Sequence, residues 1–158
     1  MQRYQVIPRV LVFLTREEKV LLIQGAPDKR HWANLYNGLG GHVERGESVL
    51  EAAEREVWEE SGLLARNLWL CAAVTIDLPK EESGILMFVF RGEALEEEVT
   101  ASKEGELKWV RQDEVKGLDL VEDLPILLSL VLELSPQGAP LWGRYWYDKQ
   151  GKLRTEFT

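Results

Sequence analysis

Cysteine and histidine are scarce in this chain of 158 residues. Cys71 is its single cysteine, and His31 and His42 are its two histidines. A lone cysteine cannot form a disulfide within the chain, and these three side chains are too few to enclose a zinc ion. A disulfide scaffold and a closed zinc site are therefore excluded, and we expect a cytoplasmic protein.

Long hydrophobic runs and positive charge are also lacking. The longest apolar stretch, residues 126–134, is interrupted by Ser129 and Glu133 and is less than half a membrane span. Residues 1–5 contain no apolar signal core. With 19 basic against 27 acidic residues, the net charge of −8 disfavours nucleic-acid polymers and membranes. We expect a small-molecule partner, a metal ion to mediate any phosphate binding, and a monomer or homodimer.

The composition predicts a single domain over residues 1–158. Hydrophobic residues make up 45% and charged residues 29%, and the length is close to the commonest domain size. Periodicity and turn residues predict helices at 47–61 and 124–134 and a C-terminal hairpin at about 141–157. Further strands are predicted at 4–14, 19–24, 35–39, 68–78, 85–90 and 107–110. This mixture indicates an α/β or α+β fold in which helices cover a mixed sheet.

The helix predicted at 47–61 has clear end signals. Ser48 and Glu51 form a capping box, and Gly62 supplies the C-terminal stop. At about 100° per residue, four apolar side chains share one arc of this helix. They are Val49, Leu50, Ala53 and Val57.

Three carboxylates of this helix lie together. Glu56, Glu59 and Glu60 occupy a sector of roughly 100°, and Glu60 falls inside the apolar arc. Two carboxylates about 6 Å apart repel by nearly 3 kcal/mol at an effective dielectric of about 20, and no lysine lies within one helical turn. A hard divalent cation such as Mg²⁺ would relieve this repulsion. Glu51 and Glu54 point elsewhere and are expected in solvent.

Three glycines precede the helix in the segment Gly38-Leu39-Gly40-Gly41. We expect a loop here, because glycine permits positive φ and lets main chain approach a ligand closely. Beside a carboxylate-rich helix, such a loop predicts a phosphate and metal site.

The spacing over residues 41–63 is similar to the Nudix box. Five residues separate Gly41 from Glu47, and seven more precede the run Arg55-Glu56-Val57-Trp58-Glu59-Glu60-Ser61-Gly62-Leu63. The chain thus resembles a Nudix hydrolase, with a MutT-like approach to the box at 36–44. The resemblance implies an α/β/α sandwich with a mixed β-sheet flanked by helices. It also implies hydrolysis, dependent on Mg²⁺ or Mn²⁺, of a nucleoside diphosphate linked to another group.

The resemblance also assigns roles by position. It implies an orienting charge pair between Arg55 and Glu47, and metal ligation by several oxygen donors in or beside the box. These donors are Glu56, Glu59, Glu60 and the carbonyl oxygen of Gly40.

Family members often add a glutamate from a loop before a Trp-bearing strand. Glu104, five residues before Trp109, best fits that position as ligand or base, with Glu106 as its competitor. The general base is left open between Glu59 and Glu104.

The sequence leaves three functions open, one favoured and two alternatives. MutT-like members remove oxidised nucleoside triphosphates such as 8-oxo-dGTP, which is the favoured class. Pro79, 16 residues after Leu63, lies near a proline of ADP-ribose-cleaving members, so an ADP-ribose or nucleotide-sugar pyrophosphatase is the first alternative. A non-catalytic nucleotide-binding module is the second, and it would predict a degraded box, which the intact acids disfavour.

Aromatic residues could contact a nucleotide. Trp32 and Tyr36 flank the glycine segment and, with Gly41, are expected to bind substrate. In the C-terminal hairpin, alternation places Tyr145 and Tyr147 on one side, where core packing is favoured over base contact.

Overall fold

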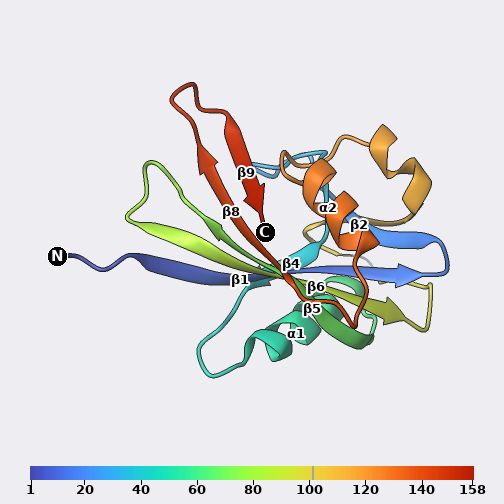
Figure 1. Ribbon diagram of the computed structural model, residues 1–158. Coiled ribbons are helices and arrows are strands. Elements are labelled where there is room, and N and C mark those ends of the chain that lie inside the picture. The colour runs from blue at the N-terminus through green and yellow to red at the C-terminus, as the bar shows by residue number, and fades with distance from the viewer. Residues whose placement is uncertain (101) are drawn as a thin grey trace.

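The computed structural model describes residues 1–100 and 102–158. Within these residues, a nine-stranded mixed sheet lies between two α-helices, α1 (Val49–Ser61) and α2 (Leu124–Glu133), which cover opposite faces (Figure 1). This arrangement confirms the predicted α/β sandwich with a mixed sheet flanked by helices. No helix in the described part of the chain is long and apolar enough to span a membrane.

The sheet has the strand order β3-β2-β1-β6-β5-β8-β9, with β4 paired to β1 and β7 paired to β2. The β1–β6 and β5–β8 pairs are parallel, and the others are antiparallel. The strands are β1 (Gln5–Arg16), β2 (Lys19–Gly25), β3 (Tyr36–Asn37), β4 (Leu39–His42), β5 (Ala65–Ile76), β6 (Ser83–Ala94), β7 (Gly105–Arg111), β8 (Leu141–Tyr147) and β9 (Leu153–Phe157).

Strand β1 is buried on both faces, because a helix covers each side of the sheet. Its side chains alternate, as the two-residue period of a strand requires. Leu11 and Phe13 join the core beneath α2, whereas Val10, Val12 and Leu14 join the core beneath α1. This double burial explains why β1 is nearly continuously apolar.

Helix α1 has the predicted ends but begins two residues later than predicted. Ser48 is its N-cap and forms the capping box with Glu51, so Glu47 lies outside the helix. Gly62 ends it at φ 74°, and its N–H donates to the carbonyl of Trp58 at 2.9 Å.

The predicted glycine loop is wrong. Gly40 and Gly41 lie in β4, opposite Leu11 and Val10 of β1, and neither has a positive φ. Glycine is needed at position 40 for space, since a methyl group there would lie 2.1 Å from the carbonyl oxygen of Val10. His42 is the last residue of this strand.

Helix α2 is anchored to the sheet through its C-terminal end. The Arg91 guanidinium of β6 donates from Nη1 to the carbonyls of Val131, Leu132 and Leu134 at 3.2 to 3.3 Å, which satisfies acceptors left free at a helix end.

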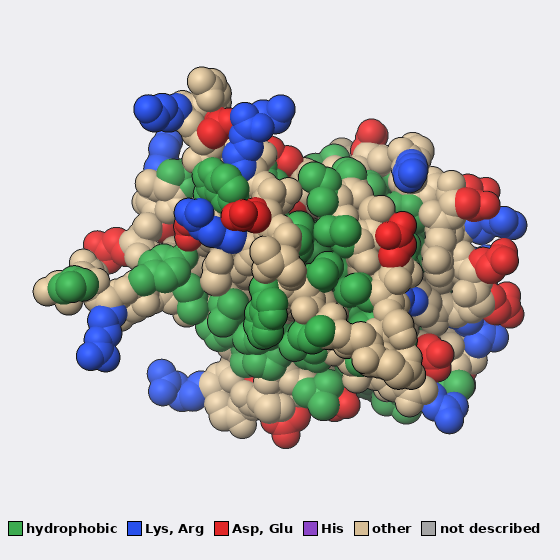
Figure 2. Space-filling model, viewed as in Figure 1, with side chains coloured by type: hydrophobic (Ala, Val, Ile, Leu, Met, Phe, Trp, Pro, Cys, Tyr) green, Lys and Arg blue, Asp and Glu red, His purple; other side chains and the backbone are tan. Residues whose placement is uncertain are grey.

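A 3-10 helix at Gln112–Gly117 was not predicted. The β8–β9 hairpin extends from the sheet edge (Figure 1). On the face shown in Figure 2, hydrophobic side chains gather centrally and charged ones lie mainly at the periphery.

Candidate active site

A cleft of about 990 Å³ runs from α1 and β4 to the C-terminal hairpin. Most of the residues expected to act together line it, although they come from four separate segments. They are Trp32, Gly40, Gly41, Glu56, Glu59, Glu60 and Glu104.

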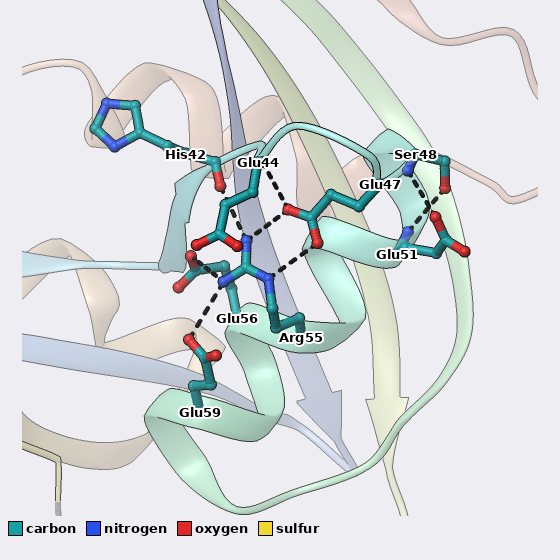
Figure 3. Close-up of polar contacts among 8 residues, drawn as sticks. All are labelled: His42, Glu44, Glu47, Ser48, Glu51, Arg55, Glu56 and Glu59. Carbon is teal, nitrogen blue, oxygen red and sulfur yellow. Dashed lines mark hydrogen bonds and ion pairs between the residues drawn. The ribbon is translucent and has the colours of Figure 1, made fainter.

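Arg55 is the centre of the polar network on α1. Its Nε and Nη2 donate to Oε2 and Oε1 of Glu47 at 3.0 and 2.7 Å, the two-point geometry that a guanidinium forms with a carboxylate. Its Nη1 donates to Glu56 at 2.9 Å and to Glu59 at 3.2 Å. Its Nη2 also donates to the carbonyl of His42 at 3.0 Å (Figure 3). Arg55 therefore ties α1 to both the preceding loop and β4.

The Arg55 network fixes the charge of Glu47. Hydrogen bonding from Arg55, followed by the backbone N–H of Glu44, lowers the pKa of Glu47 to about 2. The same pairing raises the pKa of Arg55, so both groups are charged at neutral pH. By contrast, Glu51 is engaged by the capping box and lies away from the guanidinium in Figure 3.

Glu60 is a buried carboxyl group that forms no ion pair with any residue in the described part of the chain. It is 8% exposed, and burial raises its pKa to about 8, helped by the negative charges of Glu56 and Glu104. The N–H of Gly40 opposes this shift by donating to Oε1 of Glu60 at 3.0 Å. Glu60 thus lies where the edge of β4 meets α1.

The contact with Glu60 also indicates where the Gly40 carbonyl points. In an antiparallel ladder the N–H and C=O of one residue face the same side of the strand. Because the Gly40 N–H points to Glu60 and not to β1, the Gly40 carbonyl faces the same open edge.

The donor set suits a hard divalent cation. Within residues 1–100 and 102–158, no three His, Cys, Asp or Glu side chains are gathered closely enough to enclose a metal ion, because Glu56 and Glu59 turn to Arg55. Glu56, which pairs with Arg55, nevertheless lies beside the buried Glu60 carboxyl group, and Glu60 forms no ion pair with the described residues. A hard cation with oxygen ligands would fit this pair.

Glu104 lines the same cleft as these carboxylates. It lies just before β7, forms an ion pair with Lys29, and influences the ionisation of Glu60. Its backbone carbonyl accepts from the N–H of Ala26 at 3.2 Å, which joins the two loops. Its competitor Glu106 lines a different pocket.

The two aromatic residues expected at the glycine segment have different positions. Trp32 lines the cleft. Tyr36 is 7% exposed and packs in the core beneath α2, where its hydroxyl accepts from Lys108 Nζ at 3.0 Å. It is not among the cleft residues, because β3 directs it into the core.

Sequence reasoning missed two residues at the far end of the cleft. Glu122 and Asp123, at the start of α2, line it together with Tyr145 and Tyr147 of β8. Alternation along β8 predicted that the two tyrosines share one face. The sequence around Glu122 and Asp123, by contrast, has no signal that distinguishes them from solvent-exposed acids at the start of a helix.

Comparison with known proteins defines the class of this protein. The NUDIX domain family matches residues 6–129, which is most of the chain, and the chain belongs to the Nudix family of hydrolases. Members of this family generally act with a divalent metal ion.

Three relatives show how far the similarity extends. The oxidized purine nucleoside triphosphate hydrolase of Mus musculus is 29% identical over 123 residues, which are 78% of each chain. The NAD-capped RNA hydrolase NudC of Klebsiella pneumoniae is 32% identical over 130 residues, but these are only 44% of its length. The crystal structure of the MutT protein from Bacillus halodurans matches with a TM-score of 0.80 at 27% identity, covering 96% of this chain and 97% of that one.

Proposed function

We propose that this protein is a MutT-like nucleoside triphosphate pyrophosphohydrolase for oxidised purine nucleotides such as 8-oxo-dGTP. One observation carries the proposal: a single cleft joins the carboxylates of α1 to the aromatic and apolar side chains of the C-terminal hairpin. A triphosphate fits the first end and a base the second. The similarity to MutT over 96% of this chain and 97% of that one supports this choice.

The residues of the first end would hold Mg²⁺ or Mn²⁺. Glu56, Glu60 and the Gly40 carbonyl supply hard oxygen donors at one edge of β4, and Glu59 is the further donor on α1. When bound, the ion would neutralise charge at the phosphates and lower the pKa of a coordinated water.

The remaining residues would position these groups and accept the proton. The Arg55–Glu47 pair holds the carboxylates of α1 toward the cleft, as outer-shell partners do in metal sites. Glu59 or Glu104 would take the proton of the attacking water, since each lines the cleft beside Glu60. Cleavage of a P–O–P bridge then yields a nucleoside monophosphate and pyrophosphate.

Product identification tests the proposal. The protein is incubated with Mg²⁺ and, separately, 8-oxo-dGTP, the four dNTPs, ADP-ribose, a nucleotide sugar and a dinucleoside polyphosphate, and products are identified by mass. We expect 8-oxo-dGTP to have the highest kcat/KM and to give the monophosphate and pyrophosphate. Preferred cleavage of ADP-ribose to AMP and ribose phosphate would instead establish the alternative class. In the structure Pro79, which suggested that class, lies in the β5–β6 connection and not in the cleft.

A further inference from the structure

Strand β9 is the last strand at its end of the sheet. Among the described residues it pairs with β8 alone, and Figure 1 shows it as the outer strand of the C-terminal hairpin. Such an edge presents backbone N–H and C=O groups to which a further strand can bind. The outer edge of β9 is therefore a candidate interaction surface.

The hydrogen bonds of the hairpin determine which groups face this edge. Trp142 and Thr158 exchange two bonds, each N–H donating to the other carbonyl, at 3.0 and 2.9 Å. Because residues of an antiparallel strand face the paired strand alternately, Arg154 and Glu156 also direct their backbone groups to β8. The backbone groups of the alternate residues of β9 point outward, and no backbone hydrogen bond of the described residues engages them. They are Leu153, Thr155 and Phe157.

The sequence of β9 is complementary to itself about Thr155. If two β9 strands pair antiparallel with Thr155 opposite Thr155, the outward backbone groups of the two strands meet. In this register Arg154 of each copy lies opposite Glu156 of the other, and Leu153 lies opposite Phe157. Opposite charges and apolar side chains that face each other across two strands stabilise the pair.

The two charged side chains are available for such contacts. Glu156 is exposed and forms no ion pair with the described residues. Arg154 donates from Nε to Asp148 at 2.8 Å, but its two Nη groups make no hydrogen bond in the described part of the chain. Charges of one sign on an edge strand would repel a second copy. The opposite charges of β9 instead match those of a second copy.

We propose that β9 pairs antiparallel with β9 of a second copy of this chain, which forms a two-fold dimer with one continuous sheet. The same surface of both copies forms this interface, as two-fold symmetry requires. Because β9 has only five residues, the buried area is small and the dimer should be weak and dependent on concentration. The proposal does not depend on which nucleotide is cleaved.

Sedimentation equilibrium of the whole protein, from about 1 µM to 1 mM, tests the dimer. The wild-type protein should show a monomer–dimer equilibrium in this range. Glu156→Lys replaces attraction by repulsion at both symmetric positions, so the dissociation constant should rise about tenfold or more. Glu82→Lys is the matched control, because it makes the same charge change at an exposed residue of the β5–β6 connection. It should leave the dissociation constant within about twofold of the wild-type value.

A mixture of two variants tests the register. Arg154→Glu alone should weaken the dimer as Glu156→Lys does. Mixing the two variants should restore it, because a strand with two acids then lies opposite a strand with two bases. Melting temperatures verify that each variant is folded, since Arg154→Glu also removes the contact with Asp148.

A backbone variant tests the pairing without changing charge. Thr155→Pro removes an N–H that faces the outer edge, where proline is tolerated in a strand, and should weaken the dimer about tenfold or more. In the wild-type protein, exchange of the Thr155 amide hydrogen should slow as protein concentration rises. The Glu156 amide, which faces β8, should be protected at every concentration.

Three results would overturn the proposal. The first is a wild-type protein that stays monomeric throughout the concentration range. The second is a dimer that Glu156→Lys and Glu82→Lys affect equally, which would place the interface elsewhere. The third is a mixture of folded Arg154→Glu and Glu156→Lys proteins that associates no better than either alone.

Discussion

A methyl group on Gly41 would lie 2.4 Å from Oε1 of Glu56. The carboxylate of α1 therefore occupies space that exists only because β4 has no side chain at this position. The glycine is needed for this close approach and not for a left-handed backbone, since its φ is not positive.

Gly41→Ala is accordingly expected to displace the Glu56 carboxylate. The atoms that the methyl group would meet are the end of a flexible side chain, so the carboxylate can move and stability should change by less than about 1 kcal/mol. Displacement of a metal ligand should nevertheless lower kcat/KM by about tenfold or more. Steady-state kinetics and thermal melting measure the two effects. Gly117→Ala is the matched control, because a methyl group there would contact nothing within 4 Å. Equal activity of the two variants would show that Gly41 does not position Glu56.

Glu60 should make the stability of the metal-free protein depend on pH. Its pKa is about 8 in the folded protein against 4.5 for the ordinary group, so the folded state holds a proton that the unfolded state releases. Stability should therefore fall as pH rises from about 4.5 to 8 and be unaffected by this group at lower pH. Thermal melting in chelator across this range should show the decline in the wild-type protein and a flatter profile in Glu60→Gln. Identical profiles would mean that Glu60 is not the group responsible.

Arg55→Lys should weaken metal binding while leaving the fold intact. Lysine keeps the charge but cannot reproduce the two-point contact with Glu47 or reach several acceptors in one plane. The Mg²⁺ concentration that gives half-maximal activity should rise about tenfold or more. The control is Arg111→Lys, whose pair with Asp113 lies outside the cleft. If both variants need the same Mg²⁺ concentration as the wild-type protein, Arg55 has no orienting role.

Ser48→Ala should affect stability and not chemistry. Ser48 accepts from the backbone N–H of Glu51 at 3.1 Å and caps α1. Loss of such a cap costs about 1 kcal/mol, which denaturant unfolding can measure. With Mg²⁺ saturating, kcat should change less than about twofold, because neither Ser48 nor Glu51 is among the residues that line the cleft. A large fall in kcat at unchanged stability would contradict this separation.

Local signals predicted most of the fold. Strand alternation, the capping box and the stop at Gly62 were sufficient to locate α1, α2 and most strands to within a few residues. Leu50 shares the angle of the buried helix face but is 44% exposed, since packing depends on what lies opposite as well as on periodicity. The glycine segment was misread as a loop because glycine in a strand is explained only by the neighbouring chain, here Val10.

The site was predictable where it is contiguous in sequence. The acids of α1 follow from helical phase, whereas the approach of Glu104 depends on β2–β7 pairing. Tyr36 lies in the core because β3 pairs with β2 and turns this side chain inward. Glu122 and Asp123 could not be found locally, because the cleft forms only when α2 and β8 meet.

The most direct test of the account compares two glutamates of the same helix. Glu54 is exposed and lies outside the cleft, whereas Glu56 lines it. Turnover of 8-oxo-dGTP is measured under saturating Mg²⁺ for Glu54→Gln and Glu56→Gln. The account predicts a change of less than about threefold for the first and a loss of about 10²-fold or more for the second. Comparable losses in both variants would contradict the assignment of the α1 carboxylates as the metal site.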